Sequence, residues 1–231
     1  MLLLLLFGAI NQSNGQSNDT YPNIKRNSII FAPLNLFDFI NPSLQIGYER
    51  MLNQKIAVQL EGAYILNHSV GNYLIDLANG IKDCEYTNSG FKIRGEFKYY
   101  FSKGNRFRPY LSGELFYLKN KSKVMDTFIV SDTSFIYSSP RIPGYNYYHD
   151  FYTLDKQRFG LNLKIGFKMM VGENFFFEPH IGIGLVYRVS KHYDRENIND
   201  ELSGGFLSLP DKAGNMWLAN LPLNLKIGYS F

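Results

Sequence analysis

The feature that most restricts the fold is an alternation of apolar and polar residues with a period of two, which recurs along most of the chain. It is clearest in residues 89–101, where Phe91, Ile93, Phe97 and Tyr99 alternate with charged side chains. Successive side chains of a β-strand point to opposite faces, so the pattern predicts a strand with one dry face and one polar face. We expect eight such strands, at about residues 28–37, 43–51, 56–66, 89–101, 108–118, 157–171, 175–189 and 217–231.

The connections between these segments are alternately short and long. A few residues separate the second segment from the third, the fourth from the fifth and the sixth from the seventh, whereas the other gaps centre on residues 67–88, 119–156 and 190–216. In an antiparallel meander, successive connections lie at opposite ends, so all the short connections fall at one end and all the long ones at the other. Outer-membrane barrels show this asymmetry of short turns and long loops. The sequence therefore predicts an all-β fold, an eight-stranded antiparallel up-and-down transmembrane β-barrel, in one domain over residues 28–231.

The alternation alone does not decide which face of the barrel is dry. Eight strands enclose an interior just wide enough to be filled by side chains, and the polar face carries charges of both signs that could pair there. The predicted interior network consists of Glu61, Arg94, Glu96, Lys98, Glu114, Lys164, Glu178 and Arg188. Aromatic residues beside the short turns, such as Tyr99 and Phe101, fit a girdle at a membrane interface. We therefore expect the apolar face outside, and a secreted β-barrel or sandwich with a solvated polar face is the alternative.

The start of the chain predicts export. Residues 1–15 contain an apolar core of signal-peptide length followed by small residues, and a short segment, 16–27, precedes the barrel. The core lacks the charged residues that usually precede it, so we expect a truncated leader. The net charge of +4 is modest and its lysines and arginines are scattered, which argues against a nucleic-acid footprint. The single cysteine, Cys84, excludes an intramolecular disulfide.

The eight amphipathic segments, the loop asymmetry and the final "LKIGYSF" resemble the small outer-membrane β-barrel proteins of Gram-negative bacteria, of the OmpA-transmembrane-domain and OmpX type. The resemblance implies location in the cell outer membrane, surrounded by its lipids and lipopolysaccharide. It also implies that Phe231, Tyr229, Ile227 and Leu225 form a recognition signal for the barrel-assembly machinery. We expect a monomer without a cofactor.

Two prolines fall within strands that must pair to close this barrel. Pro33 lies in the first segment and Pro222 in the last. Proline has no amide hydrogen to donate to a ladder, so the sequence predicts a bulge or a local gap at this seam.

Aromatic residues are also concentrated in the longest predicted loop, "YSSPRIPGYNYYHDFYTLDKQRF". Tyrosine-rich loops form adaptable binding surfaces, so the candidate binding residues are Arg141, Tyr145, Tyr147, Tyr148 and Tyr152. Alternatively, these rings cover the barrel mouth or lie among lipid headgroups.

Catalysis is not expected. His68 and Ser69 are adjacent, so on a strand they point to opposite faces and are poorly arranged as base and nucleophile. No spacing of a metal site is readable, and the acidic run within residues 192–201 lacks the glycine turn of a calcium loop. The predicted function is non-enzymatic, in membrane integrity or surface binding through the long loops. The alternatives are an enzyme acting on lipid A, or a small pore or transporter.

Overall fold

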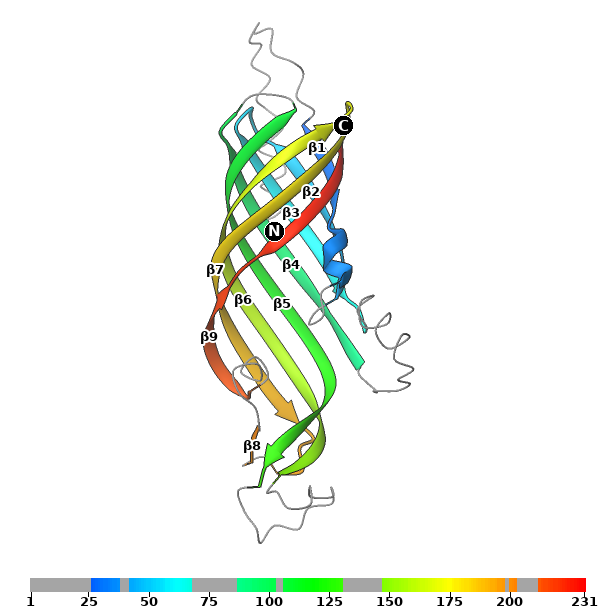
Figure 1. Ribbon diagram of the computed structural model, residues 1–231, viewed down its shortest axis with the longest axis vertical. Helices are drawn as coiled ribbons and strands as arrows, with labels where there is room; N and C mark the ends of the chain where they lie inside the picture. The colour runs from blue at the N-terminus through cyan, green and yellow to red at the C-terminus, as the bar shows by residue number, and fades with distance from the viewer. Residues whose placement is uncertain are drawn as a thin grey trace, which may run out of the picture.

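A computed structural model describes residues 26–37, 42–67, 87–102, 106–130, 147–197, 200–202 and 212–231, and its strands form a closed antiparallel barrel (Figure 1). The strands are β1 (Asn27–Phe31), β2 (Ser43–Met51), β3 (Ile56–Ile65), β4 (Thr87–Tyr100), β5 (Phe107–Ile129), β6 (Tyr147–Val171), β7 (Phe175–Tyr193), β8 (Glu201–Leu202), β9 (Gly214–Asn220) and β10 (Leu223–Ser230). β9 and β10 both pair with β7, and β10 also pairs with β1, which closes the sheet. Because β9 and β10 are two parts of one wall strand and the two-residue β8 only pairs with the end of β5, the barrel has eight strands around its circumference. The predicted fold class is confirmed, while the predicted signal peptide lies outside the described residues.

The three short connections lie at one end, here called the short-turn end. In the turn between β2 and β3, the side-chain oxygen of Asn53 accepts hydrogen bonds from the amides of Lys55 and Ile56, both at 2.8 Å. The turn between β6 and β7 begins at Gly172, whose φ of 69° favours a residue without a side chain. The opposite end, where the long connections begin, is here called the long-loop end.

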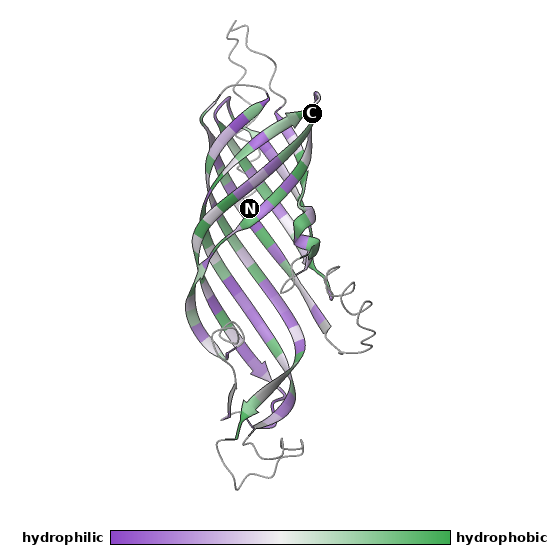
Figure 2. Ribbon diagram, viewed as in Figure 1, coloured by the Kyte–Doolittle hydropathy of each residue, from purple (hydrophilic) through white to green (hydrophobic). Residues whose placement is uncertain are grey.

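Apolar side chains point outward and polar side chains point inward, as predicted. On β4, Ile93 and Phe97 are 48% and 51% exposed on the outside, whereas Glu96 and Lys98 on the inside are 3% and 0% exposed. The hydropathy colours alternate along the strands in the same way (Figure 2). This distribution is the reverse of that of a water-soluble domain, in which lysine and glutamate are almost never fully buried and large apolar patches are covered.

Inward glycines make room for large neighbours. A Cβ atom at Gly160 of β6 would lie 2.1 Å from the Phe116 ring, and one at Gly228 of β10 would lie 2.2 Å from the Phe176 ring. Both rings therefore occupy space that a glycine on the adjacent strand leaves empty.

The seam between the first and last strands is irregular, as the two prolines predict. β1 ends at Phe31, and Pro33 begins a short 3₁₀ helix, η2 (Pro33–Phe37), so the predicted strand over residues 28–37 is wrong beyond Phe31. Pro222 separates β9 from β10. Asn35 of η2 bridges the gap, since its side-chain amide donates to Gln45 Oε1 of β2 at 2.6 Å and its oxygen accepts from Asn224 Nδ2 of β10 at 2.9 Å.

β5 and β6 are much longer than predicted and project beyond the other strands at the long-loop end (Figure 1). Residues 119–129 and 147–156, for which the sequence predicts a loop, form a paired ladder from Lys119↔Gln157 to Ile129↔Tyr147. In this projection the polarity of the two faces changes. The inward side carries a buried apolar cluster, whereas lysines appear on the outward side of β5. Met125, Ile129 and Phe151 are also exposed on the outside, so the projection carries apolar side chains on both faces.

Candidate functional site

The principal site candidate is a network of ion pairs inside the barrel. Near the short-turn end, Lys98 of β4 lies 2.6 Å from Glu49 of β2 and 2.5 Å from Glu178 of β7. Lys168 of β6 contacts the other oxygen of Glu49 at 2.8 Å. All four groups come from the inward faces of different strands, so these pairs link opposite walls of the barrel.

The network continues toward the middle of the barrel. Lys226 of β10 lies 2.8 Å from both Glu61 and Glu96, and Lys164 of β6 joins Glu96 at 2.8 Å to Glu114 at 2.7 Å. Arg94 approaches Glu114 at 3.9 Å. Neutral groups extend these contacts, since Gln45 and Gln59 both donate to Glu61.

The charges of this network balance. Five carboxylates (Glu49, Glu61, Glu96, Glu114 and Glu178) meet five cations (Arg94, Lys98, Lys164, Lys168 and Lys226). Removing one charge from water costs several kcal/mol, so buried charges persist where each has opposite charges and hydrogen bonds around it. Apart from Arg94, whose side chain is 16% exposed, the members are nearly or fully buried, and together they form a neutral plug across the lumen.

Seven of the eight predicted interior residues belong to this plug. The eighth, Arg188 of β7, is buried on the inward face but lies nearer the long-loop end, in register with Arg158 of β6. Glu49, Lys168 and Lys226 complete the plug, and the inward parity of their strands predicts their place inside the barrel.

Aromatic and guanidinium groups close the plug at the short-turn end. The rings of Tyr100 and Tyr110 meet edge to face at 5.5 Å, and the Tyr110 hydroxyl lies 3.0 Å from Glu178. The Arg108 guanidinium stacks 4.1 Å above the Tyr100 ring and donates to the carbonyl of Gln54 in the turn at 2.6 Å.

The predicted binding tyrosines do not form a loop surface where they are described. Tyr148 and Tyr152 lie in β6, 0% and 2% exposed, in the apolar cluster of the projection with Val124, Phe128, Val130 and Leu154. The prediction placed them in a loop because the outward apolar pattern stops there, although the strand continues. Tyr147 begins β6, whereas Arg141 and Tyr145 lie outside the described residues.

The catalytic and metal candidates add no site. His68, Ser69 and Cys84 lie outside the described residues. His180 is buried on the inward face of β7. Within the described ranges, no three histidine, cysteine or acidic side chains are grouped so as to hold a metal ion. No helix in the described part of the chain has both the length and the apolar character needed to span a membrane.

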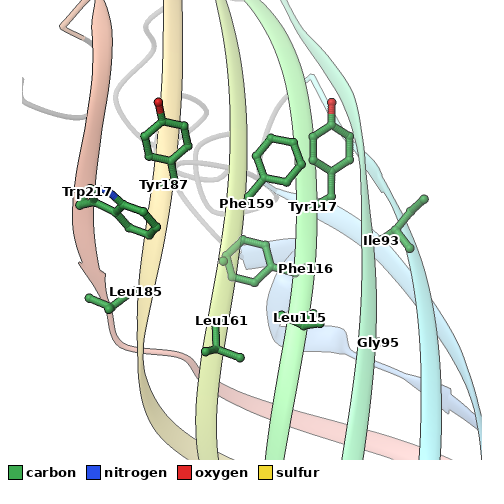
Figure 3. A pocket seen from close by; sticks show the side chains of 11 residues that line it. Ile93, Gly95, Leu115, Phe116, Tyr117, Phe159, Leu161, Leu185, Tyr187 and Trp217 are labelled. Atoms are coloured by element: carbon green, nitrogen blue, oxygen red, sulfur yellow. The ribbon is translucent and has the colours of Figure 1, made fainter.

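The outer wall carries an apolar groove with a volume of about 640 Å³. Its long-loop edge is a row in which Ile93, Tyr117, Phe159, Tyr187 and Trp217 lie in register on five neighbouring strands (Figure 3). The rings of Tyr117 and Phe159 are 4.7 Å apart, and those of Tyr187 and Trp217 are 5.1 Å apart. A second row completes the lining with Gly95, Leu115, Leu161 and Leu185, and Phe116 and Gly160 lie between the two rows.

The four rings and the groove thus form the part of the outward apolar surface that is nearest the long-loop end. The row from Ile93 to Trp217 is here called the aromatic row. A second aromatic group lies at the short-turn end, where the Phe175 and Tyr229 rings meet at 5.2 Å and Phe107 and Phe167 at 4.9 Å. Of the predicted assembly-signal residues, Tyr229 and Phe231 are 40% and 52% exposed there. Ile227 and Leu225 share the outward parity of β10.

No protein-family model and no curated protein matches the sequence. Among solved structures, the chain is similar to the N-terminal β-barrel domain of Pseudomonas aeruginosa OprF, with 15% identity, 90% of this chain and 98% of that chain covered, and a TM-score of 0.35. It is also similar to a major outer membrane protein from Thermus thermophilus, with 12% identity, the same coverage and a TM-score of 0.42. The strand pairing described above makes the fold an eight-stranded up-and-down barrel.

Proposed function

We propose that the protein is an integral outer-membrane β-barrel of the OmpA-like type, with a plugged interior and a non-enzymatic role in membrane integrity. The observation that carries the proposal is the inverted polarity of the wall. Charged residues pair inside at nearly zero exposure, while apolar side chains cover the outside. In water, this arrangement would expose a large apolar surface and bury charge at the same time, whereas lipid solvates the outside favourably.

The height of the apolar surface supports the same proposal. Phe159 of the aromatic row, toward the long-loop end, and Met169 beside the short turn are ten residues apart on β6. At about 3.3 Å per residue and a strand tilt of roughly 40°, this corresponds to about 25 Å along the barrel axis. The apolar band of an outer-membrane barrel is about 25 Å tall.

The non-enzymatic part of the proposal rests on how the buried polar groups are used. Carboxylates and amines of the plug contact one another instead of converging on a cavity that could hold a substrate. Surface binding through the long loops stays a prediction, because most of their residues lie outside the described ranges.

The test is outer-membrane fractionation of cells expressing the chain, combined with protease shaving and gel electrophoresis of heated and unheated samples. We expect the protein in the outer-membrane fraction, a heat-dependent gel shift, and external cleavage restricted to the long loops. A protein that is soluble without detergent, or one without the gel shift, would refute the membrane barrel. Single-channel recording of the purified protein distinguishes a plugged barrel from a pore, since a plugged barrel gives no stepwise conductance.

A further inference from the structure

A stripe of lysines lies on the outside of the barrel, next to the aromatic row and on its long-loop side. It consists of Lys119, Lys121 and Lys123 of β5 and Lys191 of β7, and is here called the lysine stripe. The β5 residues alternate with inward side chains, so all three point outward, and all four lysines are exposed. None of the four forms an ion pair within the described part of the chain.

The acidic group at the centre of this surface does not cancel its charge. Asp155 of β6 lies in register with both Lys121 and Lys191, between β5 and β7. Asp194, at the end of β7, accepts a hydrogen bond from the Thr153 hydroxyl at 3.1 Å. Four lysines against these two carboxylates leave the surface positive.

The lysine stripe adjoins the apolar groove. Lys119 is two residues from Tyr117 on the same face of β5, a separation of about 7 Å along the strand. A molecule with an anionic head and an apolar tail would therefore meet lysines and the groove together. The groove volume of about 640 Å³ falls within the range of roughly 300–1,000 Å³ that is usual for small-molecule sites.

The alternative is that the lysines are simply solvated, in which case they would not need to lie beside an apolar groove. At this height, however, outward aromatic residues give way to outward lysines within two positions of β5, as expected where a wall passes from acyl chains to lipid headgroups. We propose that the lysine stripe and the groove bind a phosphorylated lipid of the outer leaflet, with its phosphate on the lysines and an acyl chain along the groove. This inference rests on the proposed membrane location.

The groove contains its own reporter, because Trp217 lines it and is the single tryptophan of the chain. Bromine atoms on lipid acyl chains quench tryptophan fluorescence at short range. The protein would be refolded into phosphatidylcholine vesicles that contain either brominated phosphatidylcholine or brominated phosphatidic acid. We expect phosphatidic acid to quench Trp217 at a lower mole fraction, which would show preferential occupancy of the groove.

The decisive variant is the triple substitution K119Q/K121Q/K123Q, which leaves the groove intact. An exposed lysine near an anionic lipid surface contributes about a fivefold increase in affinity, so the preference for phosphatidic acid should fall about tenfold or more. The control R26Q/K55Q/R106Q removes the same net charge at the short-turn end and should retain the preference. Equal preference in the wild type and the lysine-stripe variant would overturn the inference and assign the stripe to solvent.

The same measurement separates this inference from the proposed membrane location. If neither brominated lipid quenches Trp217, the wall does not face lipid and the proposed location fails. If both lipids quench equally, the barrel is inserted but the groove does not select a phosphorylated lipid. Quenching by brominated phosphatidylcholine also verifies that each variant has folded into the bilayer.

Discussion

Replacing Lys98 by methionine tests whether the charge plug stabilises the barrel. Methionine fills a similar volume, so the substitution removes a charge without opening a large cavity. Lys98 is fully buried and contacts Glu49 at 2.6 Å and Glu178 at 2.5 Å. After the substitution Glu49 keeps Lys168 at 2.8 Å, but the cation nearest to Glu178 becomes Lys226 at 3.9 Å.

The expected loss follows from these contacts. Two charge-assisted hydrogen bonds contribute roughly 1.5–3 kcal/mol each, and removing one partner of a buried ion pair costs about 3–5 kcal/mol. A loss of about 4 kcal/mol in the free energy of unfolding changes the folding equilibrium roughly a thousandfold. With a urea dependence of about 2 kcal/mol per molar, the unfolding midpoint should fall by about 2 M.

The assay is reversible urea unfolding in lipid vesicles, followed by Trp217 fluorescence and by the heat-dependent gel shift. The double variant K98M/E178Q should regain part of the lost stability, because it removes the carboxylate that K98M leaves poorly paired. Lys212 is exposed outside the strands, so Lys212→Met should change the stability by less than about 0.5 kcal/mol. A K98M loss below about 1 kcal/mol, or no recovery in the double variant, would refute the reasoning.

Three further predictions test other parts of the barrel. Gly160→Val should cost about 1–3 kcal/mol in urea unfolding because its side chain would overlap the Phe116 ring, whereas Gly62→Val, whose Cβ meets nothing within 4 Å, should cost little. Asn35→Ala should cost about 1–3 kcal/mol and speed amide exchange in β10, because both side-chain bonds across the seam are lost, while Asn215→Ala, an exposed position, should do neither. Planar-bilayer recordings of the wild type should show no stepwise conductance, and regular steps would contradict a plugged lumen.

Strand positions were predicted best where the outward face is apolar. The predicted segment 43–51 has the same bounds as β2, and β3, β4 and β7 begin within two residues of their predicted starts. In these strands the inward side carries charge or small polar groups and the outward side carries large apolar groups, so the period of two is visible in hydropathy. The interior network follows from the same parity, since a residue's face is fixed once its strand is known.

The exact pairs of the plug could not be predicted in this way. Parity places Lys98 and Lys226 inside, but which carboxylate each one meets depends on the heights at which β2, β4, β7 and β10 pair. The position of each side chain along the barrel axis follows from the strand register, that is, from which residues of neighbouring strands pair. Parity in a single sequence does not determine this register. The bridging role of Asn35 has the same origin, because the prolines predict an irregular seam but not the side chain that spans it.

The error over residues 119–129 and 147–156 has a physical cause that also identifies the boundary of the apolar wall on its long-loop side. On the short-turn side of this boundary, the outward residues of β5 include Leu111, Leu115 and Tyr117. On the long-loop side they begin with Lys119. Alternation with apolar residues outside therefore follows the extent of the apolar wall and not the full length of the strand. The ladder continues through the boundary because backbone pairing depends on neither face, and Lys119, Lys121 and Lys123 then take the outward positions. If the proposed membrane location is correct, the change from outward Tyr117 to outward Lys119 marks the edge of the lipid-facing wall, and the lysine stripe begins at this edge.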